Sequence, residues 1–219
     1  MISRCVVRSA ALRGTLLAAL LATLTGCAPL IVGGAMVGGG LVATDRRTTG
    51  IQLEDQSIGG KAESRAAALA TLGRINATSY NRLVLLTGEV PSEADKAAVE
   101  ATVAQVENVR AVVNELAVGA NASFGQRSQD ALLAAKVKAS LVDAKDVQAN
   151  AYRVLAERGI VYLMGRVTQR EADRGADIAR SVPGVQKVVR VFEILTEEEL
   201  ASLGRPGPAP APAPAPRTP

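Results

Sequence analysis

One pattern occurs twice in this chain of 219 residues. Each copy begins with a short β-branched and aliphatic run that reaches a glycine, at residues 83–90 and 160–167. A Glu-Ala-Asp follows each run and opens an Ala-rich helical pattern, which leads to a Val-x-x-Val-Val step. The same order at nearly the same spacing indicates an internal duplication. The chain is therefore expected to contain two small domains of one fold.

Each copy predicts the order helix, strand, strand, helix, strand, which is an α+β fold. In the first copy the expected elements are a helix over 55–73, strands over 74–80 and 83–89, a helix that Pro91 and Ser92 begin, and a strand over 112–118. Its second helix is expected to bury Ala94, Ala97, Ala98, Ala101, Val103 and Val106. In the second copy they are a helix over 129–142 capped by Ser128, strands over 150–156 and 160–166, a helix over 169–181 and a strand over 188–195.

Composition divides the chain into six segments. These are a lipoprotein signal peptide (1–26), a lipidated Gly-rich tether (27–50), the first repeat (51–118), a linker (119–127), the second repeat (128–195) and a disordered Pro-rich tail (196–219). The Pro-Ala repeat of the tail is expected to form no core and is typical of an extended spacer. A ligand for a partner's groove is the other reading of this tail.

The first 26 residues have the features of an export signal. Arg4, Arg8 and Arg13 precede an apolar run at 14–24, which is half the length of roughly 20 residues that a membrane-spanning helix needs. Residues 24–27, Leu-Thr-Gly-Cys, resemble the bacterial lipoprotein signal. The resemblance implies cleavage before Cys27, acylation of Cys27 and, with Ala28 next, sorting to the outer membrane. A simple secretory signal with a free cysteine is the alternative.

Charge differs between the two repeats. Residues 51–118 carry six Lys/Arg and nine Asp/Glu, a net charge of −3, whereas residues 128–195 carry eleven and eight, a net charge of +3. An anionic partner should prefer the second repeat, although ordinary scatter of charge is also compatible. Of the 25 basic residues, three lie in residues 1–26, which leaves 22 against 21 acidic residues. This balance argues against a nucleic-acid binder, because that class usually has a concentrated basic surface.

The predicted helix over 129–142 has two faces of interest. Leu133, Val137 and Leu141 fall at i, i+4 and i+8 and form a core face. On or near another face fall Leu132, Ala135, Lys136 and Ala139, with Lys138 at its border. Leucine there could insert into lipid while lysine lies at a phosphate. Spacing alone leaves a second reading open, in which Leu132 belongs to the core and the lysines form a solvated face.

These residues resemble a known family, the BON domain. Its pattern is present in the second copy as Val161-x-Leu163-x-Gly165-x-Val167 and Val182-x-Gly184-Val185-x-x-Val188. The first copy has Val84-x-Leu86-x-Gly88-x-Val90 and Val106-x-Asn108-Val109-x-x-Val112. Asn108 replaces the second glycine, and asparagine tolerates the left-handed backbone. Two such repeats behind a lipoprotein signal are similar to the dual BON-domain outer-membrane lipoproteins.

The resemblance implies a lipoprotein that faces the periplasm and supports outer-membrane integrity. It also implies that the second domain binds anionic phospholipid, of the phosphatidylglycerol or cardiolipin type, through its first helix. Together with the spacing it indicates a lipid-binding set of Leu132, Ala135, Lys136, Val137, Lys138 and Ala139. The predicted helix contains no aromatic residue, and Leu132 stands where an interfacial tryptophan would be expected.

No enzyme chemistry is expected. The chain has no histidine, its one cysteine after the signal would be acylated, and no nucleophile motif or phosphate loop is evident. Acidic pairs such as Glu171 with Asp173 stand at helix starts, where the helix dipole explains them. We expect no catalytic residue, no metal site, no cofactor and no nucleic-acid partner. The alternative to lipid binding is a scaffold for envelope proteins, such as wall-remodelling or barrel-assembly partners.

Overall fold

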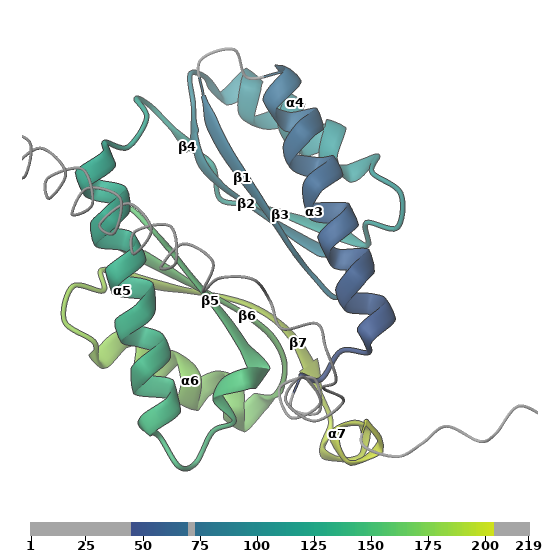
Figure 1. Ribbon diagram of the computed structural model, residues 1–219, viewed down its shortest axis with the longest axis vertical. Helices are drawn as coiled ribbons and strands as arrows, with labels where there is room; N and C mark the ends of the chain where they lie inside the picture. The colour runs from purple at the N-terminus through teal and green to yellow at the C-terminus, as the bar shows by residue number, and fades with distance from the viewer. Residues whose placement is uncertain (1–44, 70–72, 204–219) are drawn as a thin grey trace, which may run out of the picture. The chain divides into compact units, whose positions relative to one another are not determined.

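The computed structural model describes residues 45–69 and 73–203. All of them lie in one compact unit. Two α+β repeats follow one another in this unit, each with the order helix, strand, strand, helix, strand (Figure 1). The two-repeat α+β prediction is confirmed. The signal peptide, Cys27 and the tether to residue 44 lie outside the described residues, as does the tail from residue 204.

The sheet of the first repeat is built around one central strand. Its elements are α3 (Thr49–Leu69), β1 (Arg74–Tyr80), β2 (Leu83–Val90), α4 (Glu93–Ala104), β3 (Ala111–Asn114) and β4 (Ala117–Val118). β2 pairs antiparallel with β1 and parallel with β3 and β4. The single strand expected over 112–118 is interrupted at Glu115 and Leu116. There the Asn114 side chain accepts the hydrogen bond of the Leu116 N–H group (3.2 Å), and such side-chain bonds compete with a strand ladder.

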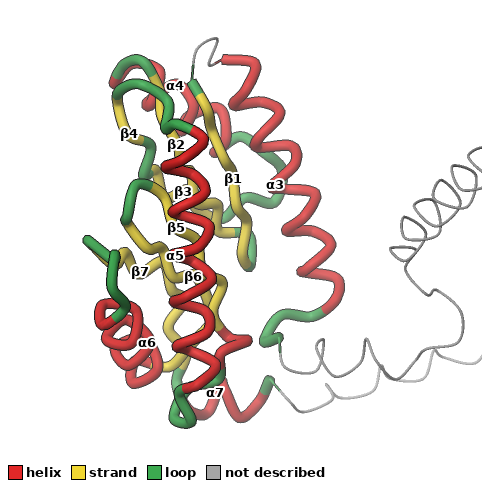
Figure 2. The backbone as a smooth tube through the Cα atoms, turned by 60° about the vertical axis from the view of Figure 1, so that its left-hand side comes forward, coloured by secondary structure: helices red, strands yellow, loops and turns green. Residues whose placement is uncertain are grey.

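The second repeat has the same topology with an unbroken third strand. Its elements are α5 (Phe124–Asp143), a short 3-10 turn η2 (Ala149–Ala151), β5 (Tyr152–Glu157), β6 (Ile160–Thr168), α6 (Gln169–Ser181) and β7 (Lys187–Leu195), followed by α7 (Glu197–Ser202). β6 pairs antiparallel with β5 and parallel with β7 over its whole length. α5 packs against β5 and α6 against β7, and Figure 2 shows α5 running along the sheet. The predicted inward residues of α6, which are Ala172, Ala176, Ile178 and Ala179, are buried.

The predicted start of one helix is wrong, and the predicted inward face of another is wrong in part. α3 begins at Thr49 rather than at residue 55, because Asp55 is a buried side chain inside the helix and not its start. In α4 the predicted alanines are exposed, whereas Val103 and Val106, which were also predicted to face inward, are buried together with Val99. A buried valine removes more apolar surface from water than an alanine, so the valines decide which face turns inward.

The glycine of the Val-x-Leu-x-Gly-x-Val motif is required by a close approach of backbone. A Cβ atom on Gly88 would lie 2.0 Å from the carbonyl oxygen of Arg74, and one on Gly165 would lie 2.2 Å from that of Ala151. The second motif position is left-handed, with φ of 66° at Asn108 and 101° at Gly184. The prediction that Asn108 replaces a left-handed glycine is confirmed.

The outer faces of the two sheets share one hydrophobic cluster. Tyr80 and Leu85 of the first repeat lie in it with Tyr162, Met164 and Val191 of the second. Ahead of α3, two consecutive arginines bind one repeat each. Arg46 donates to both carboxylate oxygens of Glu171 (2.7 Å each), and Arg47 pairs with Asp55 (2.9 Å). The segment that leads into the first repeat is thus tied to both.

Candidate functional site

α5 begins earlier than its sequence suggests. Ser123 caps it, accepting from the Gln126 N–H group while the Gln126 side chain accepts from the Ser123 N–H group. The prediction that Ser128 caps this helix is wrong, since its hydroxyl donates to the Phe124 carbonyl inside the helix. The residues 124–127, which were assigned to the linker, therefore belong to α5. They bring Phe124 into the helix, so the expectation of a helix without an aromatic residue is also wrong.

The inner face of α5 is the predicted core face. Leu133, Val137 and Leu141 are 7%, 0% and 0% exposed and pack into the core of the second repeat. Asp130 is also buried on this side. Its carboxylate accepts the N–H groups of Arg158 (2.8 Å) and Gly159 (2.9 Å) in the β5–β6 turn. The inner face thus fixes the helix to the hairpin beneath it.

The opposite face of α5 is apolar as well. We call it the outer stripe, and it consists of Phe124, Ala131, Leu132, Ala135, Ala139 and Val142, all of them exposed. Its three large members, Phe124, Leu132 and Val142, are 77%, 64% and 63% exposed. At 100° per residue these six positions fall on one side of the helix. A helix with an apolar inner and an apolar outer face presents a surface that water solvates poorly.

Cations border the outer stripe. Lys136 is exposed, and within the described part of the chain it makes no ion pair. Arg127 lies over the Phe124 ring at 5.9 Å and donates to the Ala122 carbonyl. Lys138 differs, because its ammonium donates to the carbonyls of Ala149 (2.6 Å) and Tyr152 (3.1 Å), and burial lowers its pKa. Lys136 and Arg127 are thus the cations best placed for an external anion.

The predicted site residues separate into two groups. Leu132, Ala135, Lys136 and Ala139 are exposed on one side of α5, so the reading that placed Leu132 in the core is wrong. Val137 lies in the core, so its side chain is not on the surface. Lys138 holds α5 to the start of β5. Phe124, Ala131 and Val142 were missed, and the capping box at Ser123 was the signal that would have included Phe124.

The first repeat supplies an internal comparison for α5. Asp55 of α3 accepts the N–H groups of Asn81 (2.7 Å) and Arg82 (2.8 Å), as Asp130 does with the hairpin of its own repeat. This equivalence matches α3 to α5 with a shift of 75 positions. The outer-stripe positions then correspond in α3 to Thr49, Gln56, Ser57, Gly60, Ser64 and Ala67. The same face is mostly polar in the first repeat and apolar in the second.

The described residues contain neither a membrane-spanning helix nor a cluster of metal ligands. None of the helices in residues 45–69 and 73–203 is long and apolar enough to cross a membrane. The same residues contain no group of three or more Asp, Glu, His or Cys side chains arranged to hold a metal ion.

The sequence model of the BON domain matches residues 61–120 and 129–196. Together these matches cover more than half of the chain. The chain belongs to the BON domain family. Its two BON domains correspond to the two repeats, and α5 is the first helix of the second BON domain.

Two relatives agree with this assignment, and in each the match covers two thirds or more of the relative's length. The outer membrane lipoprotein DolP of Haemophilus influenzae is 42% identical over 175 residues, which are 78% of this chain and 90% of that protein. The 21 kDa hemolysin of Actinobacillus pleuropneumoniae is 33% identical over 151 residues, 68% of this chain and 78% of that protein. The chain thus belongs to the BON-domain family that includes DolP.

Among solved structures, CdsD, a structural protein of the type III secretion system of Chlamydia trachomatis, shows a weak likeness. It is 13% identical, with a TM-score of 0.27, and the match covers 68% of this chain and 98% of that one. A TM-score this low supports no conclusion about function.

Proposed function

We propose that this protein is a lipoprotein of the outer membrane that faces the periplasm and binds anionic phospholipid through α5 of its second BON domain. Acylated Cys27 would hold the chain on the membrane, and α5 would add a second, reversible contact. The similarity to DolP, an outer membrane lipoprotein, supports the location. The role that follows is support of outer-membrane integrity, without enzymatic activity.

One observation carries the lipid-binding part of this proposal. The outer stripe exposes Phe124, Leu132 and Val142 beside the cations Lys136 and Arg127. Inserting one such large side chain into an apolar phase contributes up to about 1.5–3 kcal/mol. Each Lys or Arg at an anionic surface contributes roughly 1 kcal/mol. Free energies of this size give a weak contact. The contact becomes effective once an acyl anchor keeps α5 near the membrane.

The test uses residues 42–219, which contain both cores and cannot be acylated. We expect this chain to sediment with vesicles of phosphatidylcholine and phosphatidylglycerol, but not with phosphatidylcholine alone, and to be released by salt. Leu132→Glu and Lys136→Glu should each lower the vesicle-bound affinity by about fivefold or more. The matched controls are Leu53→Glu, at a 62% exposed leucine of α3, and Lys61→Glu, at the lysine of α3 equivalent to Lys136.

Failure to bind phosphatidylglycerol vesicles at low salt would contradict the proposal, and so would equal losses in the controls. In that case the alternative is a scaffold for envelope proteins. Partner capture that is insensitive to salt and survives Lys136→Glu would favour this alternative, because it would not depend on the basic border of the outer stripe.

A further inference from the structure

The junction between the two repeats has two ends of different chemistry. The hydrophobic cluster that the outer faces of the sheets share forms its middle. In the second repeat Glu157 pairs with Ile160 at the start of β6, and Glu193 pairs with Arg166 near the end of β6. A strand rises about 3.3 Å per residue, so the two glutamates are separated by roughly 20 Å along the sheet.

Glu193 fastens one end of the junction. From the first repeat it accepts a hydrogen bond from the Asn81 side chain (2.5 Å) and one from Arg110 (3.0 Å), and from its own repeat one from Arg166 (3.3 Å). Burial raises the pKa of Glu193, but the bond from Asn81 and the two arginines outweigh burial, and the pKa lies below the ordinary 4.5. An ionised carboxylate thus stabilises this end, which we call the Glu193 end.

The opposite end, which we call the acid end, contains two buried carboxylate groups without donors. Glu89 is 0% exposed, and among the described residues neither of its oxygens has a hydrogen-bond partner. The Oε1 atom of Glu157 is buried without a partner too. Arg158 lies 3.6 Å from Glu89 and Arg74 lies 3.9 Å from Glu157, both across the junction and beyond hydrogen-bond distance. Buried charged oxygens without donors are unfavourable.

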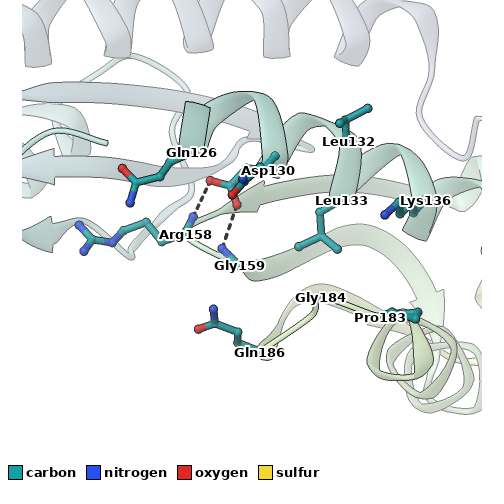
Figure 3. Close-up of a pocket in the computed structure, with 11 residues that line it drawn as sticks. Gln126, Asp130, Leu132, Leu133, Lys136, Arg158, Gly159, Pro183, Gly184 and Gln186 are labelled. Carbon is teal, nitrogen blue, oxygen red and sulfur yellow. Dashed lines mark hydrogen bonds between the residues drawn. The ribbon is translucent and has the colours of Figure 1, made fainter. Parts of the chain in front are cut away.

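The backbone at the acid end is held in place. Asp130 of α5 accepts the N–H groups of Arg158 (2.8 Å) and Gly159 (2.9 Å), which fixes the turn that follows Glu157 (Figure 3). A cavity of about 270 Å³ remains between the repeats at this end, and residues of both repeats line it. The acid end is therefore less completely packed than the shared cluster, and protons can reach it.

The charges around Glu157 oppose its ionised form. Burial has the largest effect and the charge of Glu89 the next, and both raise the pKa of Glu157 above the ordinary 4.5. Asp130 adds to this rise, while Arg74 and Arg127 oppose it. The other charged or titratable groups at this end are Lys96, Glu115, Arg158 and Tyr162. A proton on Glu157 would remove one charge and supply an O–H donor, the group that Glu89 lacks.

We propose that Glu157 carries a proton in the closed junction and donates a hydrogen bond to Glu89, and that loss of this proton at higher pH opens the acid end. The Glu193 end would stay closed and serve as the hinge. A group that binds its proton more tightly in the closed state favours closure at low pH, and this advantage is lost as pH rises above 4.5. Neither carboxylate lies on α5, so the proposal is independent of phospholipid binding.

Thiol labelling measures this opening. In the full chain with Cys5→Ser and Cys27→Ser, an introduced cysteine is the only thiol. Met164→Cys places it in the shared cluster, and Leu163→Cys places it one residue away in the core of the second repeat, both at sites that are 0% exposed. The labelling rate, divided by that of the urea-unfolded chain at the same pH, gives the open fraction. We expect the ratio of the two open fractions, Met164→Cys over Leu163→Cys, to rise about fivefold or more from pH 5 to pH 8.

Two variants test whether the acid end causes the rise. Glu157→Gln and Glu89→Gln each remove one charge and supply a permanent amide donor, so in both the ratio should keep its pH 5 value up to pH 8. Glu63→Gln, at an exposed position of α3, is the control and should keep the rise. A constant ratio in the parent chain would overturn the proposal. So would an equal rise of both open fractions, which indicates global unfolding, or a rise that persists in either glutamine variant.

Discussion

Asp55 and Asp130 make the same pair of hydrogen bonds in the two repeats. Each lies buried in the first helix of its repeat and accepts two consecutive backbone N–H groups of the hairpin turn, at 2.7–2.9 Å. Those N–H groups lie in left-handed turns, with positive φ at Asn81, Arg82, Arg158 and Gly159. The aspartate thus anchors the helix to the turn and gives the turn the partners that it lacks within the sheet.

Asp130→Asn is expected to destabilise the second repeat. An asparagine side chain has one oxygen, so one of the two turn N–H groups loses its acceptor. Leaving a buried donor without a partner costs about 1–3 kcal/mol. Urea unfolding would measure this loss, and amide exchange of Arg158 and Gly159 should accelerate. A change below about 0.5 kcal/mol, the size typical of a neutral surface site, would contradict the anchoring role.

Stability below neutral pH should depend on Glu171. Burial raises its pKa, but hydrogen bonds from Arg46 and from the Thr168 N–H group outweigh burial, and the pKa lies below the ordinary 4.5. A lowered pKa means that the ionised group stabilises the fold above pH 4.5, and that this stability is lost as pH falls through the folded value. Glu171→Gln should cost about 3–5 kcal/mol at pH 7, because Arg46 stays buried without its partner.

A double variant checks this explanation. Arg46→Met combined with Glu171→Gln removes both charges, so it should recover part of the loss seen in Glu171→Gln alone. The measurement is the free energy of unfolding at pH 7 and again near pH 3, where the difference between Glu171→Gln and the natural chain should shrink. Additive losses at pH 7 would show that the two side chains do not act as a pair.

The ionised form of Glu157 should lower the stability of the fold, whereas the ionised form of Glu171 raises it. Burial and then the charge of Glu89 raise its pKa, although Arg74 lies 3.9 Å away. Asp130 adds to the rise and Arg127 opposes it. Between the ordinary 4.5 and the raised value the folded chain binds more protons than the unfolded one, so stability falls as pH rises through this window. Glu157→Gln should therefore stabilise the chain by about 1 kcal/mol at pH 8 and have no effect below pH 4.

Urea unfolding at pH 8 and pH 4 tests whether Glu157→Gln raises the free energy of unfolding at the higher pH alone. Glu63→Gln, at an exposed position of α3, removes one negative charge without this setting and serves as the control. A loss of stability in Glu157→Gln at pH 8 would contradict this prediction, because it would show that the fold favours the ionised carboxylate.

Two glycines should respond in opposite ways to alanine. At Gly165 a Cβ atom would lie 2.2 Å from the Ala151 carbonyl oxygen, so Gly165→Ala requires the start of β5 to move and should cost about 2 kcal/mol or more. At Gly60, inside α3, a Cβ atom meets nothing within 4 Å, so Gly60→Ala should stabilise by about 0.5–1 kcal/mol. Thermal unfolding of both variants would decide, and shifts of the same sign would refute the steric account of the motif.

The sequence alone determined the duplication, the α+β order of each repeat and the core face of α5. These features depend on local chemistry, because alternating or helical apolar spacing and the glycines of the motifs are visible in the chain itself. The core face of Leu133, Val137 and Leu141 follows from their spacing alone. Boundaries were less certain, since the capping box at Ser123 lies in a stretch that is otherwise polar and rich in small residues.

Only the tertiary structure decided which side chains of α5 are available to a partner. Val137 and Leu132 are both apolar, but the packing of α5 on β5 buries the first and exposes the second. Lys136 and Lys138 carry the same charge, yet the carbonyls of Ala149 and Tyr152 engage only Lys138. Burial and ion pairing are set by contacts between segments that are distant in sequence, which periodicity within one helix does not encode.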